Sequence, residues 1–209
     1  MKIAFIGAGN MATGLGKHWA ANKGHELLFS HSRDQDKLKQ SAASVSAGAK
    51  TGTAEEAAAF ADVLVLATPY EAAPAALKAA GKLDGKLIWS IVNPLKPDYS
   101  GLQVGTTTSG AEELAKLVPG ARFISALPPF AEALHADALP TPAPTVFVCG
   151  DDAKGREAVC GLVKELGADS LDAGPLFAAR FFEPAMMGLV YLAYGQKMGG
   201  HIGLRFLHT

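Results

Sequence analysis

The chain opens with a short apolar segment, a turn with two glycines and a helical segment, and this order constrains the fold more than any other feature. Residues 2–6 have the composition of a buried strand, and Gly7 and Gly9 follow directly. Gly7 permits a tight turn off the strand, and Gly9 has no Cβ, so the backbone can approach a ligand closely. Ala12 keeps the next helix near the sheet. This pattern predicts a pyrophosphate site at the N-terminus of the helix, where free N–H groups point outward.

A second strand, predicted over Glu26–Ser30, closes a strand–helix–strand unit of about 30 residues. In this context the glycines indicate a dinucleotide site more strongly than a plain turn between a strand and a surface helix. Asn10 and Met11 lie within the same turn. We therefore expect them to contact the dinucleotide together with the two glycines and Ala12.

Strand and helix patterns alternate along the rest of the chain. The predicted strands are 2–6, 26–30, 62–67, 87–92, 122–125, 145–149 and 170–172. The predicted helices are 11–23, 36–47, 54–61, 71–80, 111–118 and 153–166. This alternation predicts an α/β fold: a Rossmann-type, doubly wound, mainly parallel sheet with extra strands and a C-terminal helical segment.

A proline-rich stretch, residues 139–144, suggests a boundary, since each proline removes a backbone donor and fixes φ. We expect a nucleotide-binding Rossmann domain over residues 1–143, and added strands with a C-terminal helix over 144–209. The uncharged run 184–196 in that helix is shorter than the roughly 20 residues that span a membrane. We therefore expect no membrane span, and a buried or subunit-interface helix that favours a homodimer.

Composition narrows the possible functions. The formal net charge is -1 and no basic stripe appears, so we expect no nucleic-acid partner. Cys149 and Cys160 and the six histidines have no metal-ligand spacing, so no metal site is expected. The first apolar run stops at Ile6, too short for a signal sequence, which favours a cytoplasmic protein.

The end of the second predicted strand bears on which dinucleotide is bound. NAD sites place a carboxylate there to bind the ribose 2′-OH, about 20 residues past the glycines. This chain has Ser30, His31, Ser32 and Arg33 instead, and a guanidinium with hydroxyls suits a 2′-phosphate. NADP is therefore the expected cofactor. Asp34 is open between capping the next helix and binding a ribose.

Two further strand ends supply cofactor candidates, because open α/β sheets bind ligands at the carboxyl edge. Thr68 and Pro69 follow one strand and are expected to line the crevice. Asn93 follows the next strand and is a candidate for the nicotinamide ribose or carboxamide. A turn role is the alternative for each.

Several motifs outside the glycine turn carry a family resemblance. They are Ser32-Arg33, Pro69-Tyr70, Ser125-Ala126-Leu127, the segments 148–152 and 171–176, Arg180 with Glu183, and the tail 198–207. With the opening turn, they make nearly the whole chain resemble the NADPH-dependent coenzyme F-420 reductases (reduced coenzyme F-420:NADP oxidoreductases).

The resemblance implies hydride transfer between NADP(H) and a small-molecule acceptor, coenzyme F-420 or a flavin. Direct hydride transfer needs no catalytic protein residue. The expected acceptor pocket comprises Leu127, Pro128, Phe130, His135, Gly174 and Pro175. Family members carry His or Asn after Leu127, whereas this chain has Pro128-Pro129, which lack backbone donors.

Two other functions are open at this point. An NADP-binding module without turnover, acting as a sensor or a partner subunit, would share the first half of the chain. An imine or β-hydroxyacid dehydrogenase would share it too, but such enzymes usually use a lysine on a long helix. Lys197 is the only lysine in the tail and lies near its end.

Overall fold

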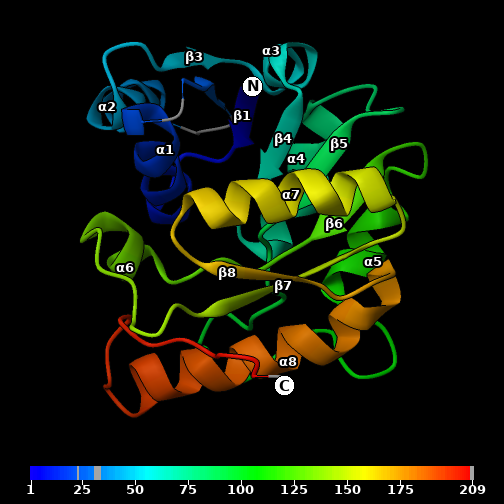
Figure 1. Cartoon of the computed structure of the whole chain (residues 1–209). Helices are drawn as coiled ribbons and strands as arrows, with labels where there is room; N and C mark the ends of the chain where they lie inside the picture. Colours follow the sequence, from blue (N-terminus) through cyan, green and yellow to red (C-terminus); the bar gives the residue numbers. More distant parts are fainter. Residues whose placement is uncertain (23, 31–33, 208–209) are drawn as a thin grey trace.

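The computed structural model describes residues 1–22, 24–30 and 34–207, and within them eight strands form one sheet (Figure 1). The spatial order is β3-β2-β1-β4-β5-β6-β7-β8. The strands are β1 (Lys2–Ile6), β2 (Glu26–Ser30), β3 (Lys50–Gly52), β4 (Val63–Leu66), β5 (Leu87–Ser90), β6 (Arg122–Ser125), β7 (Thr145–Gly150) and β8 (Asp169–Asp172).

The first six strands pair in parallel, which confirms the predicted mainly parallel, doubly wound sheet. β7 runs antiparallel to β6, with Ser125 opposite Cys149, and β8 pairs in parallel with β7. The sheet is therefore continuous across the proline-rich stretch at 139–144. β3 was not predicted, because Lys50-Thr51-Gly52 is a short edge segment without an apolar run.

Helices cover both faces of the sheet (Figure 1). They are α1 (Asn10–Asn22), α2 (Gln35–Val45), α3 (Ala54–Phe60), α4 (Ala73–Ala79), α5 (Gly110–Ala115), α6 (Ala131–His135), α7 (Ala153–Glu165) and α8 (Ala179–Val190). Side chains of α1, α2, α6 and α7 pack in one buried cluster, and those of α3, α4, α5 and the start of α8 in the other.

Strand residues alternate between these two clusters, as the pleat of a sheet requires. Ile3 and Phe5 belong to the first cluster, and Ala4 and Ile6 to the second. All four residues of β4 are fully buried, as expected for a central strand that is apolar on both faces.

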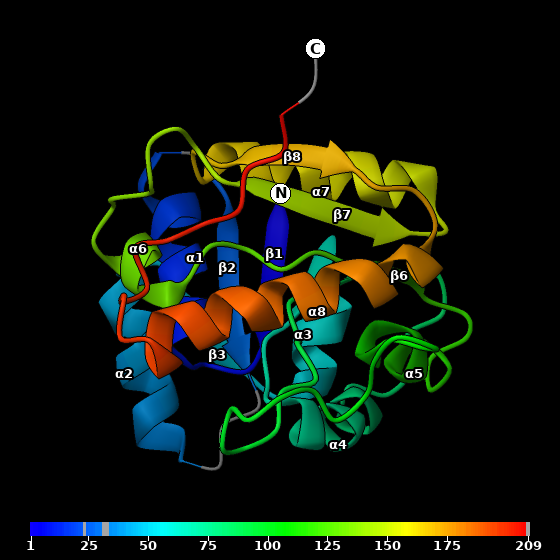
Figure 2. The same cartoon turned by 90° about the horizontal axis from the view of Figure 1, so that it is seen from below.

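The C-terminal helix lies across the edge of the sheet where the parallel strands end (Figure 2). It begins with a 3-10 turn, η2 (Leu176–Ala178), and ends in a π-helical turn, η3 (Tyr191–Gly195). Pro184 lies inside this helix without ending it. By length and composition Leu176–Gly195 would suffice to cross a membrane. However, its Glu183 is 1% exposed and bonded to α5, which ties the helix to the sheet domain.

Candidate active site

The glycine turn has the geometry that the sequence predicts. Gly7 has φ +116, and a Cβ there would collide with the carbonyl of Ala67 on the neighbouring strand end. Its N–H donates to the carbonyl oxygen of Ser30 at 2.9 Å, which joins the turn to β2. A Cβ on Gly9 would meet nothing within 4 Å. Gly7 is therefore required by the fold, whereas the space at Gly9 is free for a ligand.

The helix α1 starts directly after this turn, so its N-terminal peptide groups face the carboxyl edge of the sheet. Ala12 is fully buried in the core, which sets the close approach of helix and sheet. The Thr13 hydroxyl lies 3.2 Å from the carbonyl oxygens of both Gly9 and Asn10. These contacts fix the first turn of α1. The N-terminus of the helix, with its free N–H groups, can therefore bind an anion.

The end of β2 and the residues after it include several candidate cofactor residues from the sequence, and the structure gives two of them, Ser30 and Asp34, a role within the protein. The Ser30 hydroxyl is buried and donates to the Phe5 carbonyl at 2.8 Å, so the structure uses this side chain within the sheet. Asp34 accepts from the backbone of Asp36 and Lys37, the capping role of the two alternatives. The predictions for His31, Ser32 and Arg33 lie outside the described residues.

Two buried polar atoms at the carboxyl edge have no hydrogen-bond partner in the described structure. One is the Thr68 hydroxyl, which follows β4 beside the glycine turn. The other is Oδ1 of Asn93, whose Nδ2 donates to the Glu183 carbonyl at 3.5 Å. An unpaired buried polar group costs about 1–3 kcal/mol. Both atoms therefore suit a polar ligand in the crevice. The next residue after Thr68, Pro69, is the N-cap of a 3-10 turn, η1 (Tyr70–Ala72).

A cleft of about 530 Å³ opens at this edge between the glycine turn, the loop after β5, α6 and α8. It brings together seven of the residues that the sequence assigned to the cofactor or the acceptor: Asn10, Met11, Asn93, Leu127, Pro128, Phe130 and His135. Gly174 and Pro175 do not line it. They lie where β8 leads into η2, and the Gly174 carbonyl accepts from Gly150 at the far end of β7.

His135 joins α6 to the start of α1. Its Nε2 lies 3.0 Å from the Asn10 carbonyl, and its Nδ1 lies 3.4 Å from Nζ of Lys17. A carbonyl can only accept and an ammonium can only donate, so this geometry fits a neutral ring with the proton on Nε2. His135 thus fixes the first turn of the dinucleotide helix as well as lining the cleft.

Sequence reasoning named Phe130 but missed the two tyrosines that form an aromatic wall of the cleft with it. Tyr99 and Tyr194 have ring centroids 6.1 Å apart, and Phe130 meets Tyr194 edge-on at 5.9 Å. The Tyr194 hydroxyl donates to Oε1 of Glu132 at 2.8 Å, which links η3 to α6. Burial, followed by this hydrogen bond, raises the pKa of Tyr194. The residues in these contacts lie far apart in the sequence and meet only in the folded chain, so no local sequence motif indicates them.

Glu183 belongs to one of the sequence motifs, but nothing in the sequence indicated its role. Its carboxylate accepts from the N–H groups of Gly110 and Ala111, at 2.8 and 2.9 Å. Burial raises the pKa of Glu183 to about 7, against the lowering effect of these two hydrogen bonds. The side chain therefore locks α8 onto the N-terminus of α5, next to Asn93.

Comparison with known proteins agrees with this geometry. Residues 2–94 match the model of the family described as NADP oxidoreductase, coenzyme F-420-dependent. A putative F-420-dependent NADP reductase from an Arthrobacter species shares 26% identity and superposes with a TM-score of 0.86, covering 100% of both chains. The predicted enzyme class, an NADP-dependent oxidoreductase, is confirmed. The family resemblance that the sequence predicted is confirmed by the same two matches.

Two further structures share the fold. A hypothetical protein from Sinorhizobium meliloti is 24% identical, with a TM-score of 0.74 over 86% of this chain and 88% of that one. An imine reductase from Aspergillus terreus, solved with NADPH, is 19% identical, with a TM-score of 0.68 over 93% of this chain and 62% of the other. At these identities they support the Rossmann-type fold.

Proposed function

We propose that this oxidoreductase transfers hydride between NADP(H) and a planar ring acceptor, a deazaflavin such as coenzyme F-420 or a flavin. The observation that carries the proposal is the 530 Å³ cleft, since it borders both the glycine turn and the aromatic wall. Hydride transfer requires two rings about 3–3.5 Å apart with water excluded. A cleft between a dinucleotide turn and aromatic side chains suits that arrangement.

The residues present fit the dinucleotide. The open space at Gly9 leaves room for a pyrophosphate, and the start of α1 suits its charge. The Thr68 hydroxyl and Oδ1 of Asn93 would find partners on the ribose or the carboxamide, as an amide N–H donates to an oxygen. When bound, the nicotinamide supplies the hydride. The preference for the 2′-phosphate rests on Ser32 and Arg33 in the sequence.

The protein's own contribution is orientation and exclusion of water. Phe130 and Tyr194 form a rigid face, because Tyr194 is anchored to Glu132 and packed edge-on against Phe130. Met186 and Val190 precede Tyr194 at four-residue spacings, so the three side chains line the cleft from one face of the C-terminal helix. No proton-donating role is needed for the hydride step itself.

The acceptor edge of the cleft is where this chain differs from the family pattern. Pro128 lines the cleft and offers neither a backbone N–H nor a polar side chain. A ring carbonyl at this position would be left without a donor, at a cost of about 1–3 kcal/mol. Because this missing donor affects the binding of the acceptor ring, the test compares a flavin and a deazaflavin as separate acceptors.

The test follows NADPH absorbance with riboflavin, coenzyme F-420 and a ferric chelate as separate acceptors. We expect turnover with at least one ring acceptor and slower reaction with NADH. Tight NADPH binding without oxidation in any of the three would overturn the proposal in favour of a binding module without turnover. Calorimetric titration of NADPH alone separates that outcome from an inactive preparation.

We also propose that the chain forms a homodimer through the exposed face of the C-terminal helix. Phe177, Phe181 and Tyr191 are 50%, 63% and 54% exposed along the C-terminal helical segment. A second copy offers the same apolar face, as a two-fold interface requires. Analytical ultracentrifugation should give a dimer for the native chain and a monomer for Phe181→Glu; a native monomer would overturn this proposal.

A further inference from the structure

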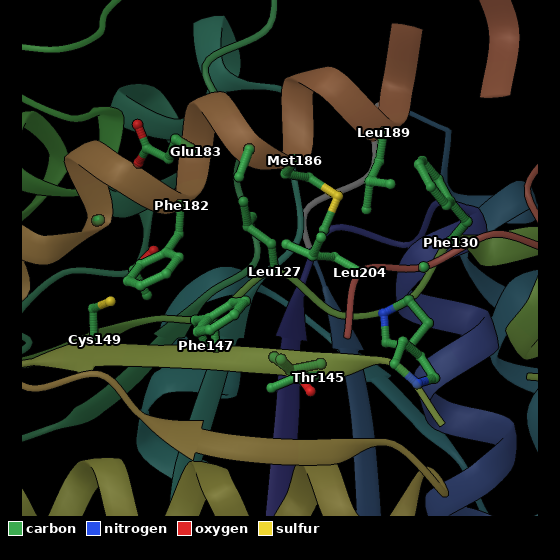
Figure 3. A pocket seen from close by; sticks show the side chains of 18 of the residues that line it. Leu127, Phe130, Thr145, Phe147, Cys149, Phe182, Glu183, Met186, Leu189 and Leu204 are labelled. Atoms are coloured by element: carbon green, nitrogen blue, oxygen red, sulfur yellow. The ribbon is translucent and has the colours of Figure 1, made fainter. Parts of the chain in front are cut away.

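A second, apolar cavity lies behind the cleft, between α8 and the strands β6 and β7 (Figure 3). We call it the annex. Phe147 and Cys149 of β7, Phe182 and Leu189 of α8, and residues 202–204 of the C-terminal segment line it. Its volume is about 40 Å³. A water-sized group needs about 10–15 Å³ on this measure, so the annex has room for roughly three such groups.

The annex and the cleft share a wall. Leu127, Phe130 and Met186 line both. In Figure 3 the Met186 side chain points from α8 into the annex. Methionine is unbranched and adapts its shape readily, so it can shift to admit a group from the cleft. A ligand in the cleft is therefore adjacent to the annex without any change in the backbone.

The lining of the annex is mostly apolar, with Ser125, Thr145 and Glu183 as its polar side chains. The Thr145 hydroxyl accepts from the N–H of Phe206 at 3.1 Å, and the Glu183 carboxylate is bonded to α5. Burial raises the pKa of Cys149 to about 12, so its thiol is neutral. Phe147 and Phe182 stack with centroids 4.2 Å apart. Cavities with such walls stay dry and bind apolar groups.

The C-terminal segment closes the annex on the outer side. The Thr145 N–H donates to the Leu204 carbonyl at 2.8 Å, and Nη1 of Arg205 donates to the Ala143 carbonyl at 2.8 Å. These contacts hold residues 202–204 over the cavity. A substituent on a ring in the cleft would enter through the wall that the two spaces share.

We propose that the annex receives a short apolar substituent, about three or four carbons long, carried by the hydride acceptor whose ring occupies the cleft. This deepens the proposed function, on which it rests, by assigning a short alkyl substituent to the ring acceptor. Burial of each methylene contributes about fourfold in affinity. Binding should therefore rise steeply with chain length and then stop at the end of the annex.

The experiment uses isoalloxazines that differ only in the N10 substituent: methyl, ethyl, propyl, butyl and hexyl, with riboflavin as the polar-tailed comparison. Dissociation constants come from quenching of flavin fluorescence without NADPH, and kcat/KM from NADPH oxidation. We expect about a fourfold gain per methylene up to propyl or butyl, and none beyond. A flat series, or a gain that continues through hexyl, would overturn the proposal.

Two variants change the annex in opposite directions without touching the cleft. Cys149→Leu fills its inner end and should shorten the best chain by one or two carbons. Leu189→Ala enlarges it and should lengthen the best chain by a similar amount. Leu117→Ala, at an exposed position that lines neither space, is the matched control and should leave the series unchanged. An identical optimum in both annex variants would also overturn the proposal.

The binding series separates this inference from the function on which it rests. If no analogue oxidises NADPH but affinity still peaks at propyl or butyl, the annex is supported and the hydride-transfer proposal fails. If NADPH is oxidised but affinity is independent of chain length, the function is supported and the annex proposal fails.

Discussion

The two sides of the cleft are built differently. The nucleotide side comes from one continuous unit, β1, the glycine turn and α1, and its shape is set by backbone geometry at Gly7 and the position of Ala12. The acceptor side is gathered from the loop after β5, from α6 and from α8, which lie far apart in sequence. One side depends on a few backbone constraints, the other on many side-chain contacts. The acceptor side can thus change its substrate while the nucleotide side stays the same.

The largest effect should come from the nucleotide side. In Gly9→Val the added side chain occupies the space where the pyrophosphate must lie, while the fold itself meets no clash. We expect a folded protein with no measurable binding of NADPH or NADH by calorimetric titration.

Gly48→Val is the matched control, because a Cβ there also meets nothing within 4 Å and the residue lies outside the cleft. It should bind NADPH like the native chain. Native affinity in Gly9→Val would show that the opening turn is not the nucleotide site.

The next largest effect tests cofactor choice. Arg33 is predicted from the sequence to pair with the 2′-phosphate, and loss of a charged hydrogen-bond partner costs roughly 1.5–3 kcal/mol, about 10- to 150-fold in affinity. Arg33→Ala should weaken NADPH binding by that factor and leave NADH nearly unchanged. If the native chain binds both cofactors equally, the preference for NADP is wrong.

Some features of the fold and of the candidate site could be predicted from the sequence, and others could not. Local rules located seven of the eight strands and the glycine turn, because Gly7 and the apolar run in β4 act within a few residues. The cleft residues Asn93 and Leu127 were also found, since strand ends in a parallel sheet share an edge. The meeting of Tyr194 with Glu132 was not predictable, because it depends on where α8 crosses the sheet. Gly174 and Pro175 were assigned to the cleft from their motif alone, and the fold carries them elsewhere.

A third test concerns the docking of α8 on the acceptor side. Burial raises the pKa of Glu183 from 4.5 to about 7, so the folded protein holds a proton there that the unfolded chain releases. This contribution to stability is full below pH 4.5 and is lost as the pH rises through 7, by up to about 3 kcal/mol.

Urea unfolding between pH 5 and pH 8 measures this directly. In Glu183→Gln, which has no titrating group at that position, the loss of stability with rising pH should be smaller than in the native chain. The same pH slope in both proteins would contradict the assignment, whatever constant offset the glutamine introduces.

The smallest expected effect is also the sharpest test of the acceptor side. Pro128 offers no donor at its own position in the cleft, and a single new hydrogen bond to the acceptor ring contributes about 0.5–1.5 kcal/mol, about 2- to 12-fold. Pro128→His should therefore raise kcat/KM with coenzyme F-420 by that factor. Pro128→Ala restores only the backbone N–H, so comparison of the two variants separates the backbone donor from the imidazole.

Fast reduction of coenzyme F-420 by the native chain, with no gain in either variant, would show that the donor comes from elsewhere in the cleft. Asn93 is then the first residue to examine, because it already lines the cleft and its Nδ2 carries a second N–H besides the one that it donates to the Glu183 carbonyl.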